Sequence, residues 1–259
     1  MKMNKKLIVA TAACAALLIG SISTSLAWLL DSSEQVVNVF NTSTIGVSLD
    51  EDESVFDMVP GWTIDKDPVV TVADNSEDCY VFIKINESIG ADIRLSSESN
   101  ALTFADYIDY AVADGWTALE SKLAAEATEA ERAAVKGVYY REVMSADSVK
   151  SFNILGASGN DAPTYDIKNT PDDTSDDVPY AWEENMVLTK PTVTKQMMDV
   201  FDDDNNGELS AEEQKDLPKL TFTAYACQLW KKNSAEDDAK FDPIDAWNFV
   251  KDLLPKVST

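Results

Sequence analysis

The chain has 259 residues, and 45% of them are hydrophobic, so it can bury a full core as one large domain or two small ones. Its 46 acidic residues against 21 basic residues give a formal net charge of -25, which argues against binding to nucleic acid or anionic lipid, since both need Lys/Arg patches. The sequence has no histidine, which excludes Ser-His and Cys-His catalysis, His-ligated zinc sites and HExxH metalloproteases.

Residues 1–27 have the features of a secretory signal peptide. Lysines near the start precede an apolar run over 7–22, and small residues at Ser25 and Ala27 favour cleavage after Ala27. The alternative is a retained membrane anchor, but the apolar run is shorter than about 20 residues and acidic residues follow it. We expect a single secreted domain over 28–259, with membrane contact only through the uncleaved signal.

Cysteine usage leaves two states open for the mature chain. Cys14 falls inside the signal, and Cys79 and Cys227 remain, both in predicted strands. An even pair in an exported protein permits one disulfide, and the alternative is two buried free thiols.

The first part of the mature chain predicts short β-strands. Two β-branched runs, 36–40 and 45–49, come first. Two more, 69–73 and 79–85, flank the turn-forming residues 74–78, which predicts a β-hairpin. Strict alternation in the last of these runs predicts a strand with two distinct faces. One face carries Cys79, Val81, Ile83 and Ile85, and the other carries Tyr80, Phe82 and Lys84.

The next segment mixes helical and extended patterns. Apolar residues over 102–113 have mixed periodicity, so helix and strand both stay open there. Capping-box spacing from Thr117 to Glu120 predicts a surface helix or helical insertion over 117–136, ended by Gly137.

Strand composition then returns before an acidic insertion. Residues 137–143 and 152–155 predict strands. The segment 156–184 is rich in Pro, Asp, Ser and Thr, which predicts a solvated loop or a disordered insertion.

The last third predicts a short amphipathic helix over 193–201, a β-rich strand over 220–230 and a C-terminal helix. Asp242 and Pro243 provide an N-cap and a first-turn proline for that last helix. In the 220–230 run one face carries Leu220, Phe222, Ala224 and Ala226, and the other carries Thr221, Thr223, Tyr225 and Cys227.

An acidic loop at 202–213 fits the EF-hand calcium pattern at every specified position. Calcium takes six to eight oxygen ligands, and Gly207 permits the sharp turn that the loop needs. The alternative is a capping box from Ser210 to Glu213, which accounts for two of these residues without an ion. The predicted ligands are Asp202, Asp204, Asn206, the carbonyl of Glu208, Ser210 and Glu213. A helix over 193–201 would enter the loop, and one over 210–217 would leave it, ended by Pro218.

Several stretches together resemble the TasA/camelysin family of exported surface and biofilm-matrix proteins of Gram-positive bacteria. They are PG-x-x-I-x-KDP-x-V and D-x-YVF-x-K over 60–86, AWLLD after the signal, GVYYREV at 137–143, the 186–201 segment and TAYA-x-Q within 219–250. The resemblance implies processing by a SipW-type signal peptidase, although Leu30 stands where the family usually has an aromatic residue.

The resemblance also implies a fold and a function. We expect a mainly β, jelly-roll-like β-sandwich with inserted helices and a C-terminal helix. We expect a non-enzymatic protein of the cell surface or biofilm matrix, without catalytic residues, that polymerises with itself or with related matrix subunits by strand exchange. The segment 28–40 is the expected donor strand.

Two other functions stay open as alternatives. One is a secreted calcium-dependent hydrolase or peptidase, since camelysin-type proteins are described as metallopeptidases. The other is a monomeric surface adhesin, which would bind a host or cell-wall ligand without self-assembly.

Overall fold

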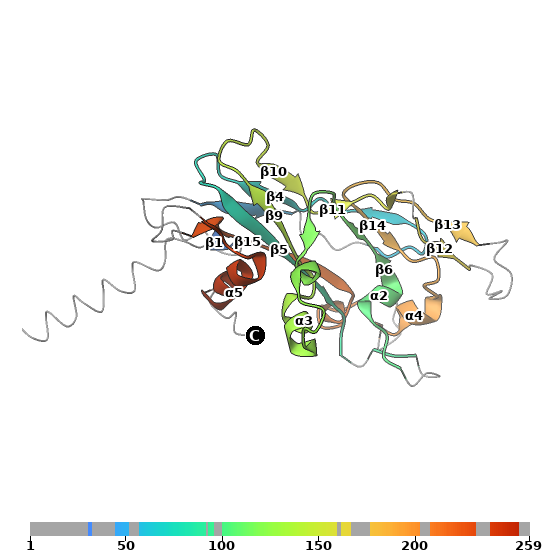
Figure 1. The fold of residues 1–259 in the computed structure, drawn as a ribbon. Coiled ribbons are helices and arrows are strands. Elements are labelled where there is room, and N and C mark those ends of the chain that lie inside the picture. The colour runs from blue at the N-terminus through green and yellow to red at the C-terminus, as the bar shows by residue number, and fades with distance from the viewer. Residues whose placement is uncertain are drawn as a thin grey trace, which may run out of the picture.

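The computed structural model describes residues 31–32, 45–51, 57–91, 93–95, 100–159, 162–166, 177–202, 208–231 and 239–253. The fold is mainly β, as predicted, and the described strands form several open sheets with helices at their margins (Figure 1). The predicted signal at 1–27 and the predicted strand at 36–40 lie outside the described residues. None of the described helices is long and apolar enough to span a membrane.

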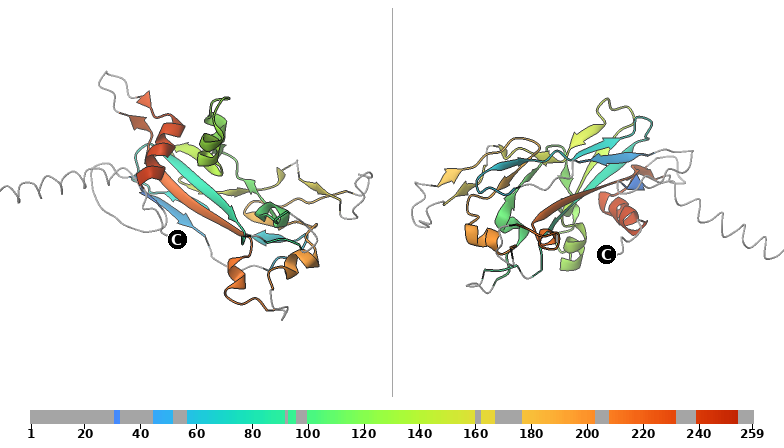
Figure 2. Two further views of the ribbon diagram at one scale, coloured as in Figure 1. Left: turned by 90° about the horizontal axis from the view of Figure 1, so that it is seen from below. Right: turned by 180° about the vertical axis from the view of Figure 1, so that it is seen from behind.

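The largest sheet, the main sheet, is antiparallel and is built around two ten-residue strands that pair along their whole length. These long strands lie side by side across the molecule in Figure 2. The order in the main sheet is β1 (Asp31–Ser32), β15 (Lys219–Gln228), β5 (Cys79–Ser88), β9 (Val138–Val143) and β8 (Thr117–Ala118).

Shorter strands complete the described structure. The second sheet has the order β10 (Ser151–Asn153), β4 (Val69–Val72) and β2 (Val47–Asp50), and the third has the order β3 (Thr63–Asp65), β14 (Met186–Thr189) and β6 (Ile108–Asp109). Two-stranded pairs join β11 (Leu155–Gly156) to β7 (Ala111–Val112), β12 (Thr164–Tyr165) to β13 (Val178–Pro179), and β16 (Trp230–Lys231) to β17 (Ala239–Lys240).

Helices are short except at the C-terminal end. They are α2 (Phe104–Tyr107), α3 (Glu129–Val135), α4 (Lys195–Asp199) and α5 (Pro243–Leu253), with 3-10 turns η1 (Leu119–Lys122) and η4 (Glu213–Lys215). The predicted cap of the last helix is confirmed, because the Asp242 carboxylate accepts a hydrogen bond from the Ile244 amide at 2.8 Å.

The main sheet is buried on both faces, which explains the two apolar faces seen in the sequence. Its inner face packs on the second and third sheets through Cys79, Val81, Ile83, Ile85, Phe222, Ala224 and Ala226. Its outer face packs on η1, α3 and α5 through Tyr80, Phe82, Val138, Tyr140 and Cys227. Figure 2 shows α5 crossing β5 and β15 at one end of the main sheet. The predicted alternation of 79–85 and 220–230 is confirmed.

The hairpin prediction for 69–85 is wrong. β4 pairs with β2 and β10, whereas β5 pairs with β15 and β9, so residues 73–78 carry the chain between two sheets. Both strands have apolar faces that pack into the same core from opposite sides, which separates them into different layers. Ser76 is buried in this connection, and its hydroxyl accepts a hydrogen bond from the Gly46 amide at 3.1 Å.

The helix predicted over 117–136 begins about twelve residues later than the capping-box spacing indicated. Thr117 and Ala118 form the edge strand β8 against β9, and the helix α3 begins at Glu129. Its capping box is formed by Thr128 and Glu131. Gly137 follows the helix with a φ of +71°, and a Cβ there would lie 2.4 Å from the Ile85 carbonyl oxygen, so glycine is required.

Two segments resolve into more structure than their composition indicated. Residues 102–113 contain both candidate structures, helix α2 and then strands β6 and β7. The described ends of the acidic insertion 156–184 pair as β12 and β13, which corrects the prediction of a wholly solvated loop. Trp182 is buried there and donates a hydrogen bond from Nε1 to the Gly156 carbonyl at 3.2 Å.

Candidate functional site

The EF-hand-like loop is anchored to the core at both described ends. Phe201, after α4, is buried against Tyr107 with ring centroids 5.4 Å apart. Leu209 packs on the core cluster of the inner face, as the loop pattern predicts. The helix predicted to enter the loop is confirmed as α4, but the predicted helix over 210–217 is only the 3-10 turn η4. Pro218, which has no amide hydrogen, closes this segment before β15 begins at Lys219.

Two of the predicted ligands, Ser210 and Glu213, form the capping box that was the alternative to a calcium site. Glu213 accepts a hydrogen bond from the Ser210 amide at 2.7 Å, and the Ser210 hydroxyl accepts one from the Glu213 amide at 3.3 Å. A carboxylate can accept more than one partner on each oxygen, so the capping box and a calcium ion do not exclude each other at Glu213.

Asp202 and Glu208 lie at the described ends of the loop, and Asp204 and Asn206 lie outside the described residues. Within the described part of the chain, no group of three or more His, Cys, Asp or Glu side chains is arranged to hold a metal. Because two of the six ligands are outside that part, calcium binding stays a prediction.

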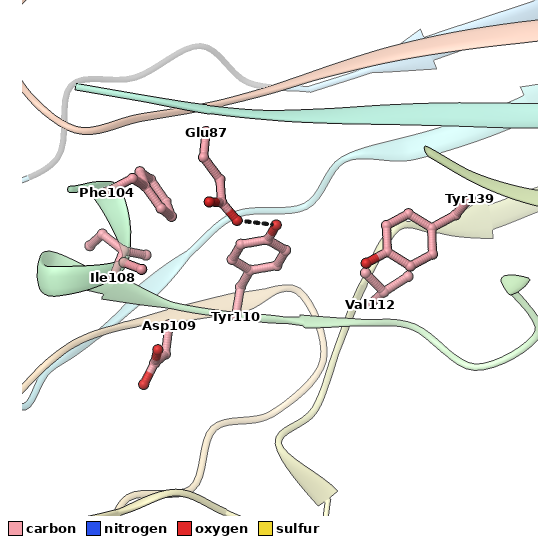
Figure 3. A pocket seen from close by; sticks show the side chains of 8 residues that line it. Glu87, Phe104, Ile108, Asp109, Tyr110, Val112 and Tyr139 are labelled. Carbon is pink, nitrogen blue, oxygen red and sulfur yellow. Dashed lines mark hydrogen bonds between the residues drawn. The ribbon is translucent and has the colours of Figure 1, made fainter. Parts of the chain in front are cut away.

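A shallow cavity of about 370 Å³ lies beside the main sheet and was not predicted from the sequence. Figure 3 shows Tyr110 and Glu87 facing each other within it, and the Tyr110 hydroxyl donates a hydrogen bond of 2.7 Å to the Glu87 carboxylate. Burial, with a further contribution from Glu87, raises the pKa of Tyr110, so this hydroxyl stays a neutral donor. Asp109 pairs with Lys190 at 3.2 Å. Tyr110 and Glu87 therefore satisfy each other, and Asp109 is paired with a lysine outside the lining.

The two cysteines of the mature chain are free thiols buried on opposite faces of the main sheet. In the β5–β15 register Cys79 pairs with Gln228, and Cys227 pairs with Tyr80, so the two side chains point away from each other. Burial raises the pKa of each thiol to about 12. The open question of a disulfide is thereby answered in favour of two free thiols.

The first described residues bear on the donor-strand prediction. Strand β1, which comes from the predicted donor segment 28–40, pairs antiparallel with β15 of its own chain through Asp31–Ala226 and Ser32–Tyr225. Along the edge of β15 that pairs with β1, residues 219–223 have no strand partner among the described residues. Among the described residues, an N-terminal strand therefore pairs with part of one edge of the main sheet.

No protein-family model, curated protein or solved structure matches the chain. The resemblance to the TasA/camelysin family therefore stays a prediction made from the sequence motifs.

Proposed function

We propose that this chain is an exported, non-enzymatic structural protein of the Gram-positive cell surface or biofilm matrix, whose subunits assemble into fibres by N-terminal strand donation. The observation that carries the proposal is the short pairing of β1 with the edge of β15. A strand that adds to an open sheet edge gains main-chain hydrogen bonds whichever chain supplies it.

Exchange of this strand between subunits is favoured by the length of the edge. In the described part of the chain two residue pairs join β1 to β15, whereas β15 has ten residues. A longer donor from a neighbouring subunit would pair with residues 219–223 as well. Exchange of an identical element between subunits adds few new requirements, because the same contacts re-form between chains.

The negative charge of the chain suggests a role for calcium in assembly. A formal net charge of -25 opposes packing of identical subunits, and multivalent cations offset such repulsion. Calcium bound at 202–213 would also brace the segment between α4 and β15, the strand that accepts the donor. We therefore include calcium as the expected ion of the assembled state.

Deletion of residues 28–40 from the mature chain 28–259 tests the proposal. Negative-stain electron microscopy and sedimentation should show fibres for 28–259 and soluble monomers for 41–259. Deletion of 254–259 is a matched control at the other terminus and should leave fibre yield unchanged. Both deletions should keep the circular dichroism spectrum of the parent. Fibres of unchanged yield from 41–259 would contradict strand donation.

A further inference from the structure

Arg141 occupies an unusual position for a cation in so acidic a protein. It lies on β9, on the same face as Tyr139, and its guanidinium carbon is 3.8 Å from the centroid of the Phe152 ring on β10. The Trp116 ring lies 5.1 Å from the same carbon, and its Nε1 donates a hydrogen bond to the Asn153 carbonyl at 2.8 Å. The aromatic rings therefore hold the guanidinium between the main sheet and the second sheet.

The guanidinium has no acceptor among the described residues. It forms no hydrogen bond and no ion pair with any of them, and two aromatic rings flank it. Two other partly buried cations have carboxylate partners, since Lys66 pairs with Glu51 and Lys190 pairs with Asp109. Burial also lowers the pKa of Arg141, although an arginine in a protein stays charged. Partial burial of this charge is thus not offset by a carboxylate within the described part of the chain.

Arg141 is half-buried, and Gly115 lies close against its guanidinium. Gly115 has a φ of +87°, and a Cβ at this position would lie 2.6 Å from Nη2 of Arg141. A side chain at Gly115 would therefore collide with the guanidinium. Because the rings restrict the arginine before any ligand arrives, less side-chain entropy is lost when its N–H groups bind an acceptor.

Two kinds of acceptor match the fork of N–H donors on arginine, carboxylates and phosphates. The net charge of -25 distinguishes them, because long-range repulsion of a ligand grows with the ligand's charge. A carboxylate carries one negative charge, and a phosphate near neutral pH carries more. The field of this protein therefore favours the carboxylate.

We propose that Arg141, flanked by the rings of Trp116 and Phe152, is a binding site for a carboxylate group. The carboxylate can come from a small organic acid or from an acidic side chain of a second copy of the chain. The site does not depend on fibre formation, so failure of the strand-donation proposal would leave it untouched.

Nuclear magnetic resonance of the intact 15N-labelled mature chain tests this site with sodium acetate as the probe. Arg94, Arg132 and Arg141 each give one side-chain Nε–Hε signal. We expect the Arg141 signal to shift saturably with acetate, and not with sodium chloride at equal ionic strength. Arg132, which pairs with Glu120 on the surface, is the internal control and should shift little. Sodium phosphate should bind more weakly than acetate.

Two variants extend the test. Arg141→Lys keeps the charge but loses the fork, and should weaken acetate binding by about tenfold in calorimetry. Phe152→Leu should weaken it about threefold by removing one flank, with the circular dichroism spectrum unchanged. Arg132→Lys should bind acetate as the parent does.

A dilution series without acetate separates the two sources of the carboxylate. A shift of the Arg141 signal with protein concentration identifies a second copy as the donor, and a constant signal together with acetate binding identifies a small acid. A non-saturating acetate response, or an equal response at Arg132, would overturn the proposal. Tighter binding of phosphate than of acetate would overturn the assignment to carboxylates.

Discussion

Substitution of Trp247 by alanine tests whether α5 is an integral layer of the fold. Trp247 is 2% exposed and packs on the outer face of the main sheet. Its ring lies 5.6 Å from Phe82 and 5.2 Å from Tyr225, measured between ring centroids. Among the described residues of α5, Trp247 alone makes ring contacts with both β5 and β15.

The expected loss of stability follows from this packing. Truncation of a buried tryptophan to alanine costs about 3–5 kcal/mol, because the lost transfer free energy and the new cavity add. The Nε1 hydrogen bond to the Ala134 carbonyl is long, at 3.3 Å, and adds little. Ala246 and Val250 stay buried on the same helix. We therefore expect a loss of about 3 kcal/mol, or roughly 6–12 °C in Tm for a domain of this size.

Urea unfolding followed by circular dichroism measures the effect. With a urea m-value of about 1–3 kcal/mol/M, the midpoint should fall by at least 1 M. Phe249→Ala is the matched control on the same helix, because Phe249 is 39% exposed. It removes an aromatic ring and gains similar helix propensity, and should cost less than about 1 kcal/mol. A loss below 1 kcal/mol for Trp247→Ala, or equal losses for the two variants, would refute the packing of α5 on the main sheet.

Three further predictions concern the loop, the thiols and pH. Glu213→Gln should lower calcium affinity by more than about tenfold in calorimetry, while Glu212→Gln, one position away from the predicted ligand, should not; equal affinities would contradict the EF-hand assignment. In the native protein at pH 8, Cys79 and Cys227 should not react with a thiol reagent, and both should react after unfolding, since burial raises the pKa of each to about 12; a native protein without free thiols would contradict this. Hydrogen bonds from the Ser145 amide and Trp230 lower the pKa of Asp78 in the folded state. The ionised carboxylate therefore adds stability at pH values above the unfolded pKa of about 4, and this stability is lost as the pH falls through the lower folded pKa. Asp78→Asn should therefore flatten the acid limb of the Tm–pH curve below pH 4, and an unchanged limb would contradict it.

The strands themselves could be predicted from periodicity, but their partners could not. The two-residue period of 79–85 gives the faces of β5 correctly, since it depends only on which side chains meet an apolar layer. Pairing depends on the whole core. The run 69–73 joins the second sheet. Its buried side chains pack against those of β5 from the opposite layer of the core, so it does not pair with β5 in one sheet.

Local capping signals were ambiguous for the same reason. Thr117 and Thr128 each precede a glutamate by three residues, so both fit the capping box. Pairing of Thr117 with Tyr140 on the edge of β9 decides for a strand at the first, and the helix begins after the second. Sequence reasoning placed neither the cavity beside Tyr110 nor Arg141 in a site. For Arg141 the only signal was an arginine that follows two tyrosines in the strand VYYREV.

A cysteine pair placed across β1 and β15 tests strand donation most directly. Asp31 and Ala226 are paired residues in the described register, and paired residues of antiparallel strands lie close enough for a disulfide. The Asp31→Cys/Ala226→Cys variant would assemble under reducing conditions, be oxidised, and be analysed on a non-reducing gel, with each single variant as control. Strand donation predicts a ladder of covalently linked subunits. Assembled fibres that yield only internally cross-linked monomers would contradict it.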